Sequence, residues 1–158
     1  MIEGDVVNVS IDVAVDPAEA FRLFTEDIDL WWKTDPAYRV TKSSLLKFEP
    51  YTGGRFLDIH ESRGTLREVG KVLVWQPPDR LVFEWRGINF KSSDNTEVEV
   101  IFSAVDVGTR VRLSHRGWAS LAREHPVRHG MDTVRFIANM SDWWAQLLES
   151  YLKQQQRQ

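Results

Sequence analysis

Near its C-terminus the chain changes its hydrophobic period, and this change limits the folds that it can adopt. Apolar side chains recur every three or four residues between Met131 and Lys153, which predicts one long amphipathic helix. The region from Leu45 to Trp118 instead contains short apolar runs, bounded by turn residues, of the length typical of strands. Because the helix must bury its apolar stripe, we predict an α+β domain in which an antiparallel sheet wraps around it. The predicted stripe consists of Ile137, Met140, Trp144, Leu148 and Tyr151.

The N-terminal part of the chain is expected to supply one more strand and two short helices. Residues 6–15 alternate between apolar and polar side chains, which is the period of a half-buried strand. Asp16 can cap a following helix, Pro17 suits its first position, and Glu19 completes a capping box. A second short helix is expected to end before Pro36.

The length of 158 residues predicts a single domain over residues 1–158. We expect its core to span about residues 5–153 and residues 154–158 to form a frayed polar tail. The sequence contains no cysteine, which excludes disulfides and thiolate zinc sites and suits a reducing compartment.

The net charge of −3 argues against a nucleic-acid partner, because such proteins present a basic face. No apolar segment approaches the length of a membrane span, so none is expected. Met1 is followed by neither a basic stretch nor an apolar run, which predicts no signal peptide and a cytoplasmic protein.

Residues 70–87, GKVLVWQPPDRLVFEWRG, form a predicted hairpin whose register follows from side-chain alternation. With the turn at the two prolines, Trp75 would oppose Arg80 on the outer face of the sheet. On the inner face, Trp85 would lie across from Gly70. The inward pairs of this register are Val74–Leu81, Val72–Phe83 and Gly70–Trp85.

A second hairpin, with its loop at Val105–Gly108, gives chemically sensible pairs on both faces. Opposite charges meet on the outer face and apolar side chains meet on the inner face. The expected pairs are Glu97–Arg116, Val98–His115, Val100–Leu113, Ile101–Arg112 and Phe102–Val111.

An ordered set of landmarks over about residues 5–153 resembles the family related to the activator of Hsp90 ATPase, within the START-like (Bet v 1-like, SRPBCC) helix-grip superfamily. The resemblance implies a seven-stranded antiparallel sheet around the C-terminal helix, two short helices, and often a hydrophobic cavity between sheet and helix. One departure is that Trp143 stands where the family usually has a glycine before Trp144, so its ring is expected to occupy space in this region. The landmarks are Val9–Val15 followed by Asp16–Phe21, Trp31-Trp32, Gly53–Phe56, Gly70–Val72, Pro77–Trp85, Val98–Phe102, Thr109–His115, Trp144 and Leu148.

The leading functional hypothesis is the binding of a small hydrophobic or aromatic ligand, including a lipid, in that cavity. A mostly apolar pocket with a few polar groups is the usual form of such a site. The alternative interpretation of the same inward residues is an ordinary filled core. The candidate ligand-binding residues are Phe56, Asp58, His60, Val72, Phe83, Trp85, Val100, Phe102, Leu113, His115, Met140 and Trp144.

An enzyme of the cyclase or hydrolase kind is a further alternative. Asp58, His60 and Glu68 are expected inside on adjacent strands, where they could hold a proton or a polar ligand group. They could equally form a solvated rim, and His115 could be a hydrogen-bonded core residue. No metal is assigned, because His125 and the second histidine four residues later lack a third ligand. No catalytic residue or cofactor is assigned, because the sequence contains no G-x-S-x-G motif, P-loop or dinucleotide-binding fingerprint.

The outer face of the sheet suggests a different role, that of a protein-interaction module associated with a chaperone. Leu73, Trp75 and Val82 would form one outer apolar patch able to dock a protein partner or a second copy of the chain. Scattered surface apolar residues without a role are the alternative.

Overall fold

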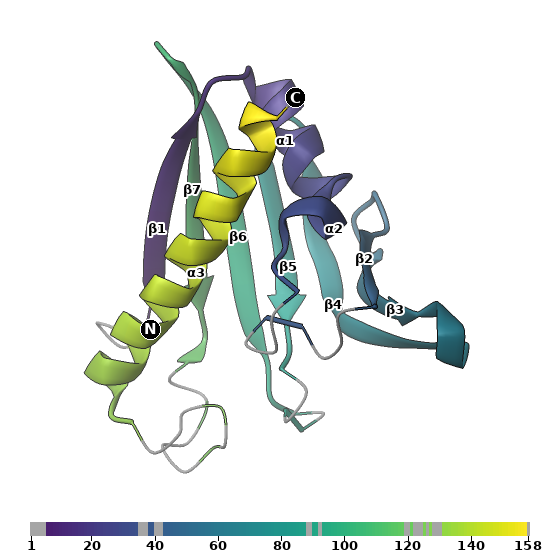
Figure 1. The fold of residues 1–158 in the computed structure, drawn as a ribbon. Coiled ribbons are helices and arrows are strands. Elements are labelled where there is room, and N and C mark those ends of the chain that lie inside the picture. The colour runs from purple at the N-terminus through teal and green to yellow at the C-terminus, as the bar shows by residue number, and fades with distance from the viewer. Residues whose placement is uncertain are drawn as a thin grey trace.

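A curved antiparallel sheet wraps around one long helix in the computed structural model (Figure 1). The structure describes residues 6–34, 38–39, 43–87, 90–91, 93–118, 121, 125, 127 and 131–157. The elements are β1 (Val7–Val13), α1 (Pro17–Thr25), α2 (Ile28–Trp31), β2 (Leu45–Phe48), β3 (Arg55–His60), η1 (Glu61–Arg63), β4 (Thr65–Gln76), β5 (Arg80–Trp85), β6 (Thr96–Val105), β7 (Gly108–Arg116) and α3 (Thr133–Gln156).

The sheet has seven strands in the order β1-β7-β6-β5-β4-β3-β2. This order makes β1 and β2 the edge strands. All neighbouring pairs are antiparallel. The helix-grip α+β fold expected from the sequence is confirmed. No helix among the described residues is long and apolar enough to cross a membrane.

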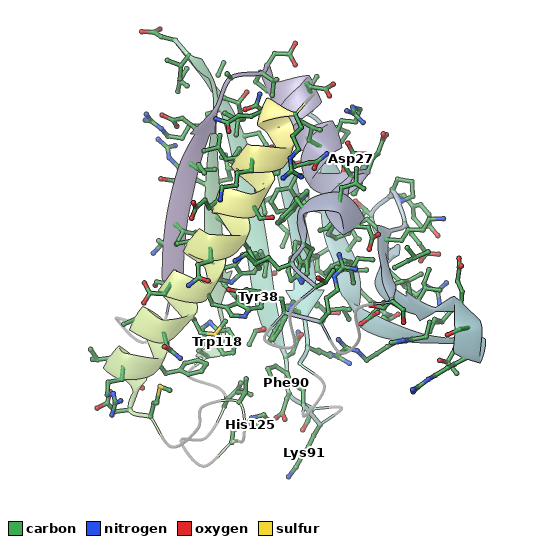
Figure 2. All side chains as sticks on the ribbon, in the orientation of Figure 1. Asp27, Tyr38, Phe90, Lys91, Trp118 and His125 are labelled. Atoms are coloured by element: carbon green, nitrogen blue, oxygen red, sulfur yellow. The ribbon has the colours of Figure 1, made fainter. Side chains whose placement is uncertain are left out.

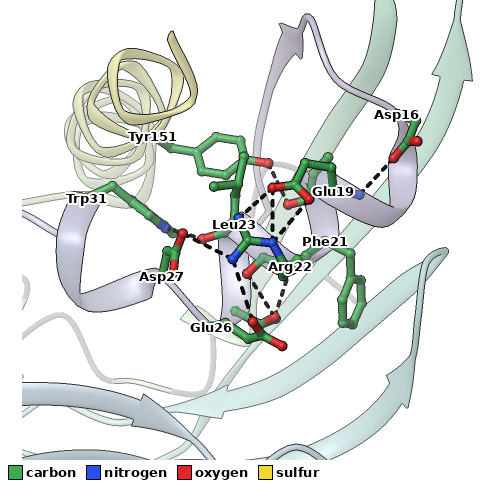
Figure 3. A network of polar contacts seen from close by, with 11 residues as sticks. Asp16, Glu19, Phe21, Arg22, Leu23, Glu26, Asp27, Trp31 and Tyr151 are labelled. Atoms are coloured by element: carbon green, nitrogen blue, oxygen red, sulfur yellow. Dashed lines mark hydrogen bonds and ion pairs between the residues drawn. The ribbon is translucent and has the colours of Figure 1, made fainter. Parts of the chain in front are cut away.

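The two short helices connect the sheet to α3. Asp16 caps α1, because its Oδ1 accepts a hydrogen bond from the backbone N–H of Glu19 at 2.9 Å, as predicted. The indole of Trp31 in α2 donates to the carbonyl of Leu23 at 3.1 Å, and the Tyr151 hydroxyl of α3 donates to the carbonyl of Ala20 at 2.7 Å (Figure 3). These buried bonds fasten α1 and α2 to each other and to the C-terminal half of α3.

The helix α3 continues past the predicted end of the core. It runs to Gln156, and Gln155 is buried with its Oε1 3.4 Å from the backbone N–H of Ala14. The prediction of a frayed tail from residue 154 was therefore wrong, because this contact to the N-terminal part of the chain holds the last turn.

The β6–β7 hairpin has the predicted register at all five expected pairs. Its alternation is regular from end to end, so side-chain parity is sufficient to assign each residue to a face. In the β4–β5 hairpin the pair Val72–Phe83 is also confirmed.

The register beyond Val72 differs, because a β-bulge at Leu73 shifts the pairing by one residue. Trp75 consequently lies opposite Leu81 and faces inward, with its ring centroid 5.2 Å from that of Phe21. The prediction that Trp75 stacks over Arg80 on the outer face was wrong for this reason.

Gly70 is a position where the backbone of a neighbouring strand comes unusually close. It lies opposite Phe56 of β3, and a Cβ placed on it would be 1.9 Å from the carbonyl oxygen of Glu84. The glycine is thus required by the close approach of the β5 backbone at Glu84. The sequence had instead placed the ring of Trp85 across from it.

We expect Gly70→Ala to lower the free energy of unfolding by about 3 kcal/mol or to prevent folding. Backbone atoms cannot move away by a rotamer change, so the clash must displace a strand. Denaturant unfolding measures the effect, with the exposed neighbour Lys71→Ala as control. A loss for Gly70→Ala no larger than that of the control would contradict this account.

Candidate functional site

Most of the predicted apolar cavity residues belong to a packed aromatic core. The ring of Phe83 lies 5.3 Å from that of Phe56, and the indole of Trp144 lies 5.6 Å from that of Trp32. These rings meet between the middle of the sheet and α3, so they fill this part of the interior by contact with one another. The buried members of the predicted set are Phe56, Val72, Phe83, Val100, Phe102, Leu113, Met140 and Trp144.

His115 takes part in a buried hydrogen-bond chain that crosses three strands. The indole N–H of Trp144 donates to His115 Nδ1 at 2.9 Å, and His115 Nε2 lies 2.8 Å from Thr96 Oγ1. Because an indole is only a donor, Nδ1 accepts and Nε2 carries the proton. The Thr96 hydroxyl in turn donates to the carbonyl of Trp85 at 2.6 Å. Both nitrogens of His115 are thereby occupied within the core.

This environment keeps His115 neutral. Burial lowers the pKa of His115 to about 3, since no carboxylate compensates the desolvation of the imidazolium. A neutral imidazole with both nitrogens bonded orients Trp144 and Thr96, but it offers no free group for proton transfer.

The aromatic side chains are less completely buried at the end of the sheet where β5 stops. Here Trp85 is surrounded by the rings of Trp143 at 6.0 Å and Phe90 at 5.6 Å, and Tyr38 stacks on Trp143 at 5.1 Å. All four are only partly buried. Figure 2 shows Tyr38 and Phe90 in the half of the molecule that contains the start of α3. We call Tyr38, Trp85, Phe90 and Trp143 the mouth cluster.

Trp143, which the resemblance singled out as a departure, lies at the mouth cluster. Its ring also contacts those of Trp32 and Trp144, at 5.8 and 5.1 Å. The extra indole therefore fills space beside α3, as the sequence suggested. It also adds an aromatic ring to the mouth cluster.

Trp118 lies directly behind the mouth cluster. It is 1% exposed, and its ring centroid is 4.4 Å from that of His115 and 6.1 Å from that of Trp85. Its Nε1 has no hydrogen-bond partner among the residues that the structure describes. A buried N–H without an acceptor is costly, and it can bind an acceptor atom of a ligand or a water molecule.

The polar residues predicted beside the cavity are only partly brought together. Asp58 is 2% exposed, and its Oδ1 lies 3.6 Å from His60 Nε2 and has no hydrogen bond. Glu68 is exposed and lies opposite Leu57, so its predicted inward position was wrong. The reason is a register shift between Phe56 and Leu57, which reverses the parity of β4.

The shift puts Arg67, and not Gly70, opposite Asp58. Burial lowers the pKa of Arg67 although the charge of Asp58 raises it. Arg67 Nη1 donates to the carbonyl of Arg86 at 3.0 Å, and Arg86 follows Trp85 in the chain. Asp58 and Arg67 are thus opposite each other on neighbouring strands, and Arg67 is connected through its hydrogen bond to the strand end that carries Trp85.

No group of three potential metal ligands occurs among the described side chains. His125 Nε2 instead lies 2.9 Å from Asp94 Oδ2. The pKa of the Asp94 carboxyl is lowered, first by the hydrogen bond from the backbone N–H of Lys91 and second by this contact with His125. The histidine four residues after His125 lies outside the described residues.

Sequence reasoning missed three of the four mouth residues and Trp118. Tyr38 and Phe90 lie in connections, where no hydrophobic period assigns a direction to a side chain. Trp118 follows a glycine with φ of 100° at position 117, which interrupts the strand parity. The doubled tryptophan at positions 143 and 144 was the one signal that pointed to this end of the molecule.

The fold agrees with the comparisons to known proteins. The family model described as activator of Hsp90 ATPase homolog 1-like protein matches residues 14–151. The chain belongs to this family. No curated protein sequence matches it.

Several solved structures share the fold at low sequence identity. A protein from Mesorhizobium loti superposes with a TM-score of 0.67 at 18% identity, over 96% of this chain and 97% of that one. The Aha1 dimer from Colwellia psychrerythraea gives a TM-score of 0.62 at 20% identity, over 95% and 92%. A protein from Nitrosomonas europaea gives 0.66 at 12% identity, over 99% and 97%.

The neutral state of His115 predicts a dependence of stability on pH. The pKa of His115 is about 3 in the folded state and about 6.5 when unfolded. Its contribution is therefore complete above the unfolded pKa and is lost as pH falls toward the folded pKa, by up to about 1.4 kcal/mol per pH unit. Denaturant unfolding of the wild type and His115→Gln at a series of acid pH values measures this slope.

The glutamine amide supplies one donor and one acceptor, so it can replace both hydrogen bonds without titrating. We expect His115→Gln to be less stable near neutral pH and to show a shallower acid slope. Ser114→Ala, next to His115 in β7, removes no titratable group; it is the control and should keep the slope of the wild type. Equal slopes for the wild type and His115→Gln would contradict the assignment.

Proposed function

We propose that this protein binds a small hydrophobic or aromatic ligand at the mouth cluster, between the end of β5 and the middle of α3. The observation that carries the proposal is the set of four partly buried aromatic rings around Trp85. Aromatic side chains are common in the lining of small-molecule sites, where they supply a large apolar contact area. The family supports this choice, because helix-grip proteins often bind ligands between sheet and helix.

The polar groups around the cluster narrow the ligand chemistry. The unpaired Nε1 of Trp118 provides a donor, so the ligand should carry a hydrogen-bond acceptor. The carboxylate of Asp58 and the guanidinium of Arg67 provide a second polar contact on the β3–β4 side. A planar ring with a carbonyl or ether oxygen fits this pattern, and a lipid with an apolar chain and polar head is the other candidate.

The buried members of the predicted set would pack beneath the mouth cluster and hold its rings in place. His115 would hold Trp144 and the Trp85 backbone in place, and His60 would adjoin Asp58. We assign no reaction to the site, since Asp58, His60 and Glu68 do not form the group expected of an enzyme. A cytoplasmic location remains a prediction.

Docking of a protein partner is the second candidate, and the family description favours it. The predicted outer patch is smaller than expected, because Trp75 faces inward and Val82 is 3% exposed. Leu73 remains 40% exposed on β4. A partner or a second copy of the chain would therefore have to bind largely through other residues of the outer face.

The proposal predicts that Trp85→Leu and Trp143→Leu each weaken ligand binding about tenfold or more, because each removes a ring that the ligand would cover. Anilinonaphthalene sulfonate is a suitable probe, and its fluorescence gives the affinity. Native mass spectrometry of the purified protein tests for a co-purified ligand, which both variants should lose.

Leu73→Ala on the outer face is the matched control and should bind the probe like the wild type. If the two mouth variants retain full affinity for the probe, the proposal that a ligand binds at the mouth cluster is wrong. If Leu73→Ala instead abolishes co-purification of a protein partner, docking of that partner on the outer face replaces ligand binding as the proposed function.

A further inference from the structure

A second pocket lies at the opposite end of the β4–β5 hairpin from the mouth cluster. It has a volume of about 340 Å³ and lies between the end of α1, the edge strand β2 and the last residues of β4. Leu46, Phe48 and Trp75 form most of its apolar lining, with Pro50 beside them. This volume falls within the range of small-molecule sites. None of its lining residues belongs to the mouth cluster.

The pocket depends on the inward orientation of Trp75. The bulge at Leu73 turns the indole toward α1, where it meets Phe21 edge to face at 5.2 Å and Phe48 at 6.3 Å. Trp75 nevertheless stays partly exposed. A large ring fixed by two neighbours, with part of its surface open to a pocket, provides a rigid platform for another planar group.

The α1 side of the pocket favours a positive charge. Glu26 and Thr25 line it, and they form the C-cap and the last residue of α1. Unpaired carbonyl groups give the C-terminus of a helix a partial negative charge, which adds to that of the Glu26 carboxylate. Arg22 offsets this charge only in part, because its guanidinium is shared among the carboxylates of Glu19, Glu26 and Asp27 (Figure 3).

The β2 side favours a negative charge. Lys47 lines the pocket there, and it forms no ion pair with any side chain in the described part of the protein. The pocket therefore combines an apolar floor with an anionic and a cationic side chain on different elements. Such a pattern is complementary to a ligand that carries both charges beside an apolar group.

We propose that this pocket binds a small zwitterion with an aromatic side chain, that is, a free aromatic amino acid. Its ammonium group binds Glu26 at the end of α1, its carboxylate binds Lys47, and its ring packs on Trp75. The hydroxyl of Thr25 donates to the carbonyl of Phe21 at 2.8 Å, which leaves its oxygen available as a further acceptor for the ammonium group. The site is independent of the ligand proposed for the mouth cluster.

Proton–nitrogen NMR of the indole groups gives a direct test, because the seven tryptophans report on different parts of the molecule. The signal of Trp75 is assigned with Trp75→Phe. L-phenylalanine is titrated beside phenylpropanoate, which lacks the ammonium group, and phenylethylamine, which lacks the carboxylate. We expect L-phenylalanine to shift the Trp75 signal and to bind about threefold or more tightly than either analogue.

Two variants assign each charge to its residue. Glu26→Gln should remove the preference for L-phenylalanine over phenylpropanoate, and Lys47→Gln should remove the preference over phenylethylamine. Lys71→Gln, an exposed lysine on β4 that does not line the pocket, is the matched control and should keep both preferences.

The outcomes separate the possibilities. Equal affinity for the three compounds, or preferences that survive both variants, overturns zwitterion recognition. A Trp75 signal that does not move with L-phenylalanine overturns the site. Shifts confined to Trp85 and Trp143 also overturn it, because the compound would then occupy the mouth cluster.

Discussion

The structure depends on how the indole N–H of Trp144 is satisfied in the centre of the protein. Trp144 is fully buried on the stripe of α3 that the sheet surrounds, and an unpaired donor there would oppose folding. Its bond to His115 continues through Thr96 to the backbone of Trp85, so one chain of hydrogen bonds joins α3 to β7, β6 and β5. Burial keeps His115 neutral, and the same bonds hold Trp85 at the mouth.

Two irregularities in β4 decide which side chains face the interior on that half of the sheet. The register shift opposite Phe56 and Leu57 places Arg67 across from Asp58 and turns Glu68 outward. The bulge at Leu73 turns Trp75 inward. Each shift exchanges the inward and outward faces for the residues beyond it. One end of β4 therefore places Arg67 opposite Asp58, and the other end places Trp75 in the second pocket.

The two proposed sites use aromatic rings in different ways. At the mouth, four rings that contact one another remain partly exposed, those of Trp85, Phe90, Trp143 and Tyr38. At the second pocket, Trp75 provides one platform and the charges of Glu26 and Lys47 provide selectivity. Membership of the Hsp90-activator homologue family agrees with the fold of both regions but assigns a ligand to neither.

The sequence alone determined the α+β class with a sheet around the C-terminal helix, the cap of α1 by Asp16 and the five predicted pairs of the β6–β7 register, because periodicity and turn chemistry are local properties of the chain. It also indicated that Phe83, Trp85 and Trp144 face the interior. Only the tertiary structure decided the direction of Trp75, the outward position of Glu68 and the assembly of Tyr38 and Phe90 beside Trp143. A bulge forms where neighbouring strands must curve around α3, and a residue in a connection takes its place from the elements on either side. Both depend on contacts between distant parts of the chain, and alternation within one strand contains no information about them.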